Sequence, residues 1–413
     1  MDKSQAEPHP IPIVEVVPKD GKHEHAFISM YTDALDEILL QDDIKDCNCV
    51  VLSVAGASRG GKSFLLNFIL RYLTFLCTPD DQKTTDNWLG NEDGTLEGFS
   101  WTYGSKRNTT GILMWSEIFR LTLLNDQKIA VIVLDTQGIF DRRSSFRESN
   151  TFFTLSTMLS SIQIYNLNRD IPEDALQNLE YFIEYGKLIV DTGHTPFQEL
   201  LFLIRDWSWI AQYKYGSKGG QDYLEAEVLK ISDEQPFELQ ALRENIKKCF
   251  TGIRCFLMPH PGLKVVQNEN FNGSLSDIGS EFKESLEEFV PMLFPSGNLT
   301  LKEISGKKVT VAQWLVYFKW YVELFNREDL PEPRSMLMAT ATAEMVLTVK
   351  SIKEAYNEEM EIVSENYTPY MTPEELEFEH ENRKKKALRM FDEKRVMGAK
   401  FSVSHTELNW KKP

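Results

Sequence analysis

The sequence predicts an α/β domain with a mostly parallel sheet around a phosphate-binding loop, followed by an all-α helical bundle. Three observations lead to this fold class. A glycine-rich loop lies between an apolar run of strand length and a helix-forming stretch. Further apolar runs alternate with helical stretches along most of the chain. Beyond a proline-containing break, the remaining residues are rich in Ala, Met, Glu and Lys with helical periodicity.

The composition is that of a globular protein and argues against several partners. The 413 residues are 42% hydrophobic and 26% charged, enough for two or three domains. A net charge of -17 argues against nucleic acid as the main partner, because phosphate backbones attract basic surfaces. Five cysteines with one C-x-C spacing favour neither a disulfide framework nor a zinc site. With no signal peptide and no apolar stretch of about 20 residues, we expect a soluble cytoplasmic chain without a transmembrane segment.

The amino-terminal part carries no chemical motif. Residues 1–24 contain several prolines and are predicted to be a flexible arm, in which Ile11–Val17 can add an edge strand. Apolar residues at helical spacing predict a helix over Phe27–Leu40 that packs on the sheet.

The glycine-rich loop has the spacing of a phosphate-binding P-loop, with Gly56 followed after four residues by Gly61, Lys62 and Ser63. Its glycines let backbone N–H groups surround phosphate oxygens, Lys62 supplies a cation for the β- and γ-phosphates, and the Ser63 hydroxyl ligates Mg²⁺. The flanking strand and helix, Val50–Val54 and Ser63–Leu76, favour this interpretation over a structural turn. The predicted nucleotide cradle is Gly56, Ser58, Arg59, Gly60, Gly61, Lys62, Ser63 and Phe64.

Two later segments complete a phosphate and metal site. A GTPase needs a hydroxyl on a mobile loop that completes the coordination of Mg²⁺ when the γ-phosphate is present. Thr109 and Thr110 are the candidates. We favour Thr109, in a catalytic and metal-binding role. The apolar run that begins at Ile129 ends in Asp135, and Gly138 follows, which places a carboxylate near Mg²⁺ and an N–H near the γ-phosphate. The order of these motifs is far more specific than any one of them.

Base selection requires a carboxylate at the end of a later strand, because guanine presents N1–H and N2–H₂ as paired donors. No N-K-x-D sequence is present, and two Arg-Asp pairs compete. Arg205 and Asp206 close the strand that follows the helix predicted over Glu173–Ile189, so we assign Asp206 to guanine. Asp170 is left as a loop residue or the start of a helix. The expected ligands are GTP, GDP and Mg²⁺, and the expected activity is that of a GTPase.

Downstream of the base motif, two helices are predicted over Asp222–Leu229 and Leu239–Phe250, then a short strand over Arg254–Met258. The turn that follows can cap the base from its far face. Its His260 is interpreted as a turn residue, because phosphoryl transfer on a P-loop has no obligatory histidine.

Two prolines between Phe325 and Pro333 predict a linker. We therefore divide the chain into an arm (1–24), a GTPase domain (25–326), a linker (327–334) and a helical domain (335–413). In the last part, Thr372 and Glu375 form a capping box before a helix that begins at Pro373. The basic run Asn382–Lys386 is most simply a solvated helix face, with docking to acidic lipid as the minor alternative.

Hydrolysis needs an oriented water and positive charge on the transition state. Small GTPases carry a glutamine directly after the glycine of the Asp135 motif, but here that residue is Ile139, and Gln137 precedes the glycine. Arg59 lies inside the phosphate loop and is the candidate for an arginine finger supplied by the same chain. A solvent-exposed Arg59 that a partner then orders is compatible with this role.

Taken together, GASRGGKS, RNTTGI, DTQG, LIRDWS, LMPHPGLKV and DLPEPRSML resemble the atlastins, dynamin-superfamily GTPases that tether and fuse endoplasmic reticulum membranes. The resemblance covers roughly residues 25 to 400. It implies a GTPase domain, a short linker and a three-helix bundle, with GTP-dependent homodimerisation and crossing over of the bundles. It also implies action at the cytosolic face of the endoplasmic reticulum. The functional residues that carry over are Arg59, Lys62, Ser63, Thr109, Asp135, Arg205 and Asp206.

The sequence departs from the family pattern at the phosphate loop and nearby. Ser58 and Gly60 replace a phenylalanine and a lysine, and Thr102 replaces an arginine. Atlastins continue into a membrane-spanning hairpin and an amphipathic tail, which the last residues before Pro413 do not match. We therefore expect membrane contact only through segments outside this chain, and membrane-anchored relatives as possible partners. The alternatives are a guanylate-binding-protein-like GTPase, or a soluble nucleotide-gated tether or regulator without fusion activity.

Overall fold

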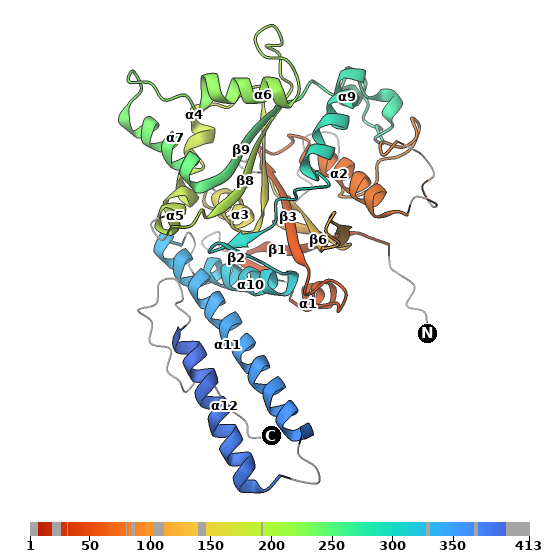
Figure 1. Ribbon diagram of the computed structural model, residues 1–413. Coiled ribbons are helices and arrows are strands. Elements are labelled where there is room, and N and C mark those ends of the chain that lie inside the picture. The colour runs from red at the N-terminus through yellow and green to blue at the C-terminus, as the bar shows by residue number, and fades with distance from the viewer. Residues whose placement is uncertain are drawn as a thin grey trace.

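The computed structural model describes residues 7–18, 26–30, 32–79, 81, 83, 87–101, 111–138, 146–190, 193–327, 331–366 and 371–393. A nine-stranded sheet forms the centre, with helices on both faces and two long helices extending away from it (Figure 1). The strand order is β2-β1-β4-β6-β3-β7-β8-β9, and β5 also pairs with β6. The strands are β1 (Pro10–Pro18), β2 (Ala26–Met30), β3 (Asn48–Gly56), β4 (Ile112–Trp115), β5 (Phe119–Thr122), β6 (Lys128–Thr136), β7 (Ile162–Asn168), β8 (Phe197–Arg205) and β9 (Phe250–Leu257).

The central strands β6, β3, β7, β8 and β9 are parallel, whereas β1, β2, β4 and β5 join antiparallel. Side chains that alternate along β3 enter two separate apolar clusters. Val50 and Leu52 lie in the cluster that includes α2 (Lys62–Cys77) and α9 (Ser280–Phe289), and Val51 lies in the cluster on the other face. Burial on both faces explains why these strands read as continuous apolar runs.

Several shorter elements cover the sheet. The remaining helices of this part are α1 (Thr32–Leu39), α3 (Phe146–Leu159), α4 (Glu173–Gln177), α5 (Glu180–Val190), α6 (Ser217–Tyr223), α7 (Phe237–Cys249), α8 (Leu263–Gln267) and α10 (Val311–Arg327). A π-helical turn (Leu224–Val228), two 3₁₀ turns (Leu275–Asp277 and Pro291–Leu293) and a hairpin of β10 (Glu303–Ile304) and β11 (Lys307–Lys308) complete it.

The two long helices are α11 (Pro333–Asn366) and α12 (Pro373–Glu393), which run side by side away from the sheet (Figure 1). The Tyr356 hydroxyl of α11 is hydrogen-bonded to Nδ1 of His380 of α12, with 2.5 Å between the two atoms, beside a small apolar cluster. The predicted capping box is confirmed, because Thr372 N donates to Glu375 Oε2 at 2.9 Å and Glu375 N donates to Thr372 Oγ1 at 3.3 Å.

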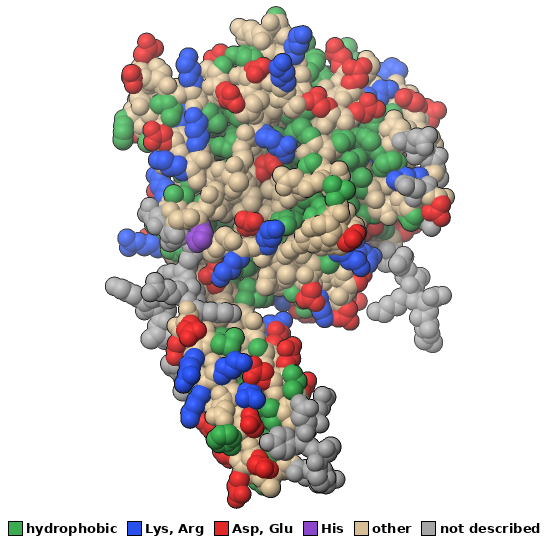
Figure 2. All heavy atoms as spheres, viewed as in Figure 1, with side chains coloured by type: hydrophobic (Ala, Val, Ile, Leu, Met, Phe, Trp, Pro, Cys, Tyr) green, Lys and Arg blue, Asp and Glu red, His purple; other side chains and the backbone are tan. Residues whose placement is uncertain are grey.

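The basic run on α12 is largely neutralised. Arg383 and Lys386 pair with Glu359 of α11, and Lys384 pairs with Glu381. Figure 2 shows Lys and Arg interspersed with Asp and Glu on this face of the helical pair. Among the described residues, none of the helices combines the length and apolar composition needed to cross a membrane.

Three expectations about elements were wrong in part. Ala26–Met30 is a strand paired with β1 and not the start of a helix, so β1 lies one strand inside the edge. The helix expected over Glu173–Ile189 is divided into α4 and α5. The helix expected over Asp222–Leu229 is instead the last two residues of α6, followed by the π turn.

Candidate nucleotide-binding site

The phosphate loop connects β3 to α2 at the carboxyl ends of the parallel strands. A Cβ on Gly56 would lie 2.0 Å from the carbonyl oxygen of Asn166, so the neighbouring strand β7 excludes any side chain at this position. Arg59 and Gly61 adopt left-handed conformations, with φ of 65° and 72°. For Arg59 this backbone is strained, as is common at functional sites.

Lys62 and Ser63 are held by contacts that meet at the loop. Lys62 is buried, and its Nζ donates to the carbonyl oxygens of Gly56 and Ala57 at 3.2 and 3.1 Å. Ser63 Oγ donates to Asp135 Oδ2 at 2.6 Å. Asp135 faces Val54 across the β3–β6 ladder, which explains how residues far apart in sequence meet. The carboxylate and the hydroxyl therefore converge at one point.

The segment after β6 lies directly against the loop. A Cβ on Gly138 would lie 2.3 Å from the Cα of Ser58, so glycine is required for this approach. Gln137 is buried, and it both accepts from Gly111 N at 2.9 Å through Oε1 and donates its own N–H to Gly111 O at 2.7 Å. Gln137 is therefore hydrogen-bonded to Gly111, which directly follows the two candidate threonines. Thr109 and Thr110 lie outside the described residues, as do Thr102 and Ile139.

Arg205 supports the loop from inside the protein. Its side chain is buried, NH1 lies 3.5 Å from the carbonyl oxygen of Gly60, and the guanidinium lies 5.3 Å from the ring centre of Phe282. Burial lowers the pKa of Arg205 to about 10, so it remains charged at neutral pH. A Cβ on Gly61 would lie 3.2 Å from NH1, which explains the glycine there.

Asp206 is half-exposed and has a left-handed backbone, with φ of 56°. Bonds on both sides hold it in this conformation. Arg169 N donates to Arg205 O at 2.7 Å, and Trp207 N donates to Met258 O at 3.1 Å. A short polar side chain tolerates this geometry better than most residues. The turn directs the chain out of β8 beside the phosphate loop.

A cavity of about 280 Å³ connects the two motifs. The loop forms one side and Asp206 another, whereas Asp170 does not line it. His260 and Pro261 also line the cavity, and His260 Nδ1 accepts from Gly262 N at 3.0 Å, as expected of a turn residue. The predicted residues in its wall are Ser58, Arg59, Gly60, Gly61, Phe64, Arg205 and Asp206.

Sequence reasoning missed several residues of this cavity. Asn166 Nδ2 donates to Gly60 O at 2.9 Å, while its buried Oδ1 has no partner among the described residues. Trp101 and Phe271 form an aromatic wall with Phe64, since both rings lie within 6.0 Å of the Phe64 ring. The available signal for Asn166 was a buried polar residue near the carboxyl end of strand β7.

Comparison with known proteins agrees with this geometry. Residues 25–303 match the family profile described as "Guanylate-binding protein, N-terminal domain", which covers more than half of the chain. Atlastin of Drosophila melanogaster is 50% identical over 380 residues, which are 92% of this chain and 69% of that protein. Atlastin-1 of Rattus norvegicus is 44% identical over 407 residues, covering 97% of this chain and 71% of the relative. The chain therefore belongs to the atlastin family of dynamin-superfamily GTPases, and it is a GTPase.

Proposed function

We propose that this GTPase recognises guanine through Asp206 and couples GTP hydrolysis to self-association and helical rearrangement, and thereby to tethering and fusion of endoplasmic reticulum membranes. The observation that carries the nucleotide part is the single cavity lined by both the phosphate loop and Asp206. A carboxylate there accepts from N1–H and N2–H₂ of guanine, which adenine does not offer as a pair. The membrane part rests on the resemblance to the atlastins, the family to which the chain belongs.

Mg²⁺ fits the oxygen pair beside the loop. The Ser63 hydroxyl and the Asp135 carboxylate lie 2.6 Å apart and are the hard oxygen ligands that Mg²⁺ prefers. Ser63, Asp135 and Thr109 are the residues that we assign to the ion, Thr109 from its position in the sequence. When bound, the ion neutralises charge that develops on the β- and γ-phosphate oxygens.

The protein's own groups then provide binding and positive charge. Lys62 exchanges its carbonyl partners in the loop for phosphate oxygens, and the loop N–H groups of Gly60 and Gly61 orient the same phosphates. Arg59 is exposed at the cavity and supplies transition-state charge once a second copy of the chain orders it. The γ-phosphoryl group passes to water as its bond to the β-phosphate oxygen breaks.

We further propose that residues 25–326 and 335–413 act as separate parts, joined by the linker at 327–334. The break between α10 and α11 supports this division. The two parts remain in contact at the junction, where Thr340 of α11 bonds Tyr185 of α5 and Tyr321 of α10. The self-associated state is a homodimer.

The test is phosphate release from GTP and, in parallel, from ATP over a range of protein concentrations, with Lys62→Ala as the control. We expect release that is selective for GTP and absent in the variant. A specific activity that rises with protein concentration supports dimer-dependent ordering of Arg59, and a flat rate contradicts it. Equal use of ATP contradicts the assignment of Asp206.

A further inference from the structure

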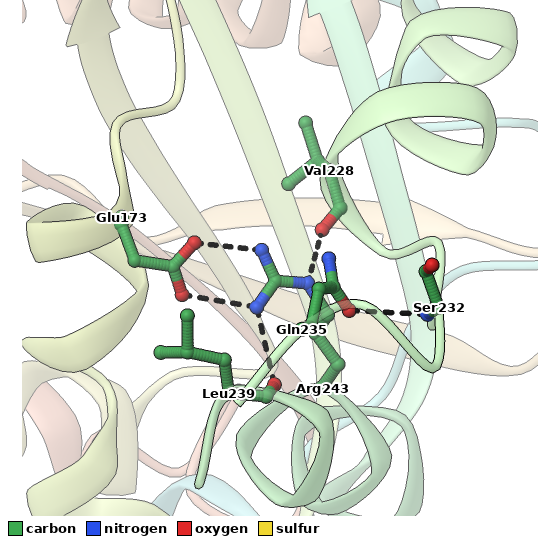
Figure 3. Close-up of polar contacts among 6 residues, drawn as sticks. All are labelled: Glu173, Val228, Ser232, Gln235, Leu239 and Arg243. Atoms are coloured by element: carbon green, nitrogen blue, oxygen red, sulfur yellow. Dashed lines mark hydrogen bonds and ion pairs between the residues drawn. The ribbon is translucent and has the colours of Figure 1, made fainter. Parts of the chain in front are cut away.

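All three guanidinium nitrogens of Arg243, in α7, donate hydrogen bonds at a position outside the nucleotide cavity (Figure 3). Only 4% of Arg243 is exposed. NH1 and NH2 donate to the two carboxylate oxygens of Glu173 at 2.9 and 2.7 Å, Nε donates to Val228 O at 2.8 Å, and NH1 also donates to Leu239 O at 3.1 Å. This paired arrangement is the strong form of an arginine–carboxylate interaction.

The contact joins two segments that otherwise leave the sheet separately. Glu173 is the first residue of α4, directly after the loop that follows β7. Val228 is the last residue of the π turn, whose signature is the bond from Leu229 N to Leu224 O at 2.8 Å. A π turn interrupts the regular geometry of an α-helix, and such turns are frequent at functional sites. Arg243 therefore fixes the distance between the β7 loop and the π turn.

The end of β7 lines the cavity, and the π turn is connected to the cavity through Tyr223. Leu167 and Asn168, at the end of β7, line the cavity. Tyr223 directly precedes the π turn, and its hydroxyl accepts from Ile171 N of the β7 loop at 3.3 Å. The Tyr223 ring lies 4.9 Å from the ring of Trp207. Tyr223 is thus held between the β7 loop and the residue next to Asp206.

Trp207 in turn fixes Asp206. Trp207 is buried, its Nε1 donates to Tyr213 O at 2.9 Å, and its backbone N–H bonds Met258 O. Because the left-handed backbone of Asp206 is intrinsically unfavourable, it persists only where neighbours hold it. The rings of Trp207 and Tyr223 are packed neighbours of this kind.

We propose that Glu173 and Arg243 are a positioning pair for the nucleobase: by joining the β7 loop to the π turn, they keep Tyr223 against Trp207 and Asp206 aimed at the base. The proposal rests on the proposed function, since it deepens the guanine recognition assigned to Asp206. Neither residue lines the cavity, so both act through Tyr223 and Trp207.

The test compares binding of GDP and IDP by titration calorimetry, since hypoxanthine lacks the 2-amino group that Asp206 is assigned to bind. The variants are Arg243→Lys, which keeps the charge but loses the paired geometry, and Glu173→Gln. Arg254→Lys is the matched control, because Arg254 pairs with Glu199 between β8 and β9 away from the cavity.

We expect Arg243→Lys and Glu173→Gln to reduce the preference for GDP over IDP about three- to tenfold, the size of a weakened charged hydrogen bond. Arg254→Lys should leave this ratio unchanged even if it lowers the melting temperature. A lowered melting temperature with an unchanged ratio in both Arg243→Lys and Glu173→Gln overturns the proposal.

Tyr223→Phe keeps the test decisive if the Arg243 and Glu173 variants do not fold. It removes only the hydroxyl that accepts from Ile171 N and leaves the ring against Trp207. We expect a smaller reduction of the same ratio, and an unchanged ratio counts against the proposal. Failure of the proposed function looks different, because the unmodified protein would then show no preference for GDP over IDP at all.

Discussion

A buried lysine lies at each end of the central strand β3, and the two have different surroundings. Lys62, after the carboxyl end, is 7% exposed and contacts carbonyl oxygens of a loop that borders a cavity. Lys302, beside the amino end, is 1% exposed and donates to Ser160 O at 2.9 Å. Burial alone does not separate a ligand-binding lysine from a structural one. The difference lies in whether a ligand can reach and replace the partners.

The backbones at the two ends differ in the same way. At the carboxyl end, Arg59, Arg169 and Asp206 have left-handed conformations. At the amino end, the backbone of Lys302 bonds Cys49 O and Val309 N, which ties β3 to the segment before α10. Ser305, near Lys302, also has a positive φ of 52°, so left-handed backbone occurs at both ends. The difference is that Arg59 and Asp206 line the cavity, whereas Ser305 does not.

The largest effect is expected at the carboxyl end. Lys62→Ala should reduce GTP hydrolysis by about 100-fold or more, because a phosphate-binding cation is lost. Lys302→Met should leave the rate within about twofold, since that lysine lies at the opposite end of β3. Steady-state phosphate release measures both. Similar losses in the two variants would show that the two lysines do not have separate roles.

The second-largest effect is expected on the free energy of unfolding, from Lys302 beside the amino end of β3. Burial lowers the pKa of Lys302 from 10.5 to about 7, so above this pH the unfolded chain binds more protons than the folded one. The free energy of unfolding should therefore rise between about pH 7 and 8.5. Lys302→Met should be more stable near pH 7 and should lose this contribution to the pH dependence. Chemical denaturation at several pH values measures it.

Thiols of the unfolded chain begin to ionise in the upper part of this range. Burial raises the pKa of the neighbouring Cys49 to about 12, which acts in the opposite direction once free thiols ionise. A pH profile in Lys302→Met that is as steep as that of the unmodified protein would contradict the assignment.

A smaller effect is expected where α11 meets the sheet domain. Thr340 Oγ1 accepts from Tyr185 at 3.0 Å and from Tyr321 at 3.1 Å, and donates to Met336 O at 3.0 Å. Thr340→Val leaves two buried phenol hydroxyls with one acceptor fewer, and should lower the free energy of unfolding by about 1 to 3 kcal/mol.

Thr342 provides the matched control for this change. It lies on the same helix, is exposed, and its Oγ1 donates to Met338 O at 2.8 Å. Thr342→Val should change the free energy of unfolding by less than about 0.5 kcal/mol. Equal effects in urea unfolding would mean that the hydroxyl contacts of Thr340 contribute nothing specific.

The sequence predicted those parts of the fold that depend on strong local patterns. The strands around Val50–Val54 and Ile129, the helix after the phosphate loop, and the capping box at Thr372 were all confirmed. Ala26–Met30 was wrongly predicted to be helical, because a short apolar run is compatible with a helix or a strand. Its pairing with β1, which the sequence does not reveal, makes it a strand. The division of α4 from α5 has no glycine or proline to mark it.

The candidate site was predictable where motif spacing is rigid. Ser63 and Asp135 meet as the spacing predicted, and Asp206 lines the cavity while Asp170 does not. Asn166 was missed, because its role follows from β7 lying beside β3 and not from its own sequence context. The roles assigned to the site residues stay predictions, namely those of Arg59, Lys62, Ser63, Thr109, Asp135, Arg205 and Asp206.

The central claim, that Asp206 reads the guanine base, is tested most directly by Asp206→Asn with GDP and XDP as paired ligands. Xanthine carries an oxygen acceptor where guanine carries the 2-amino donor, so an amide donor at position 206 should bind it. We predict that the variant loses affinity for GDP by about tenfold or more and gains affinity for XDP. A variant that binds GDP as tightly as the unmodified protein, with no gain for XDP, would contradict the account.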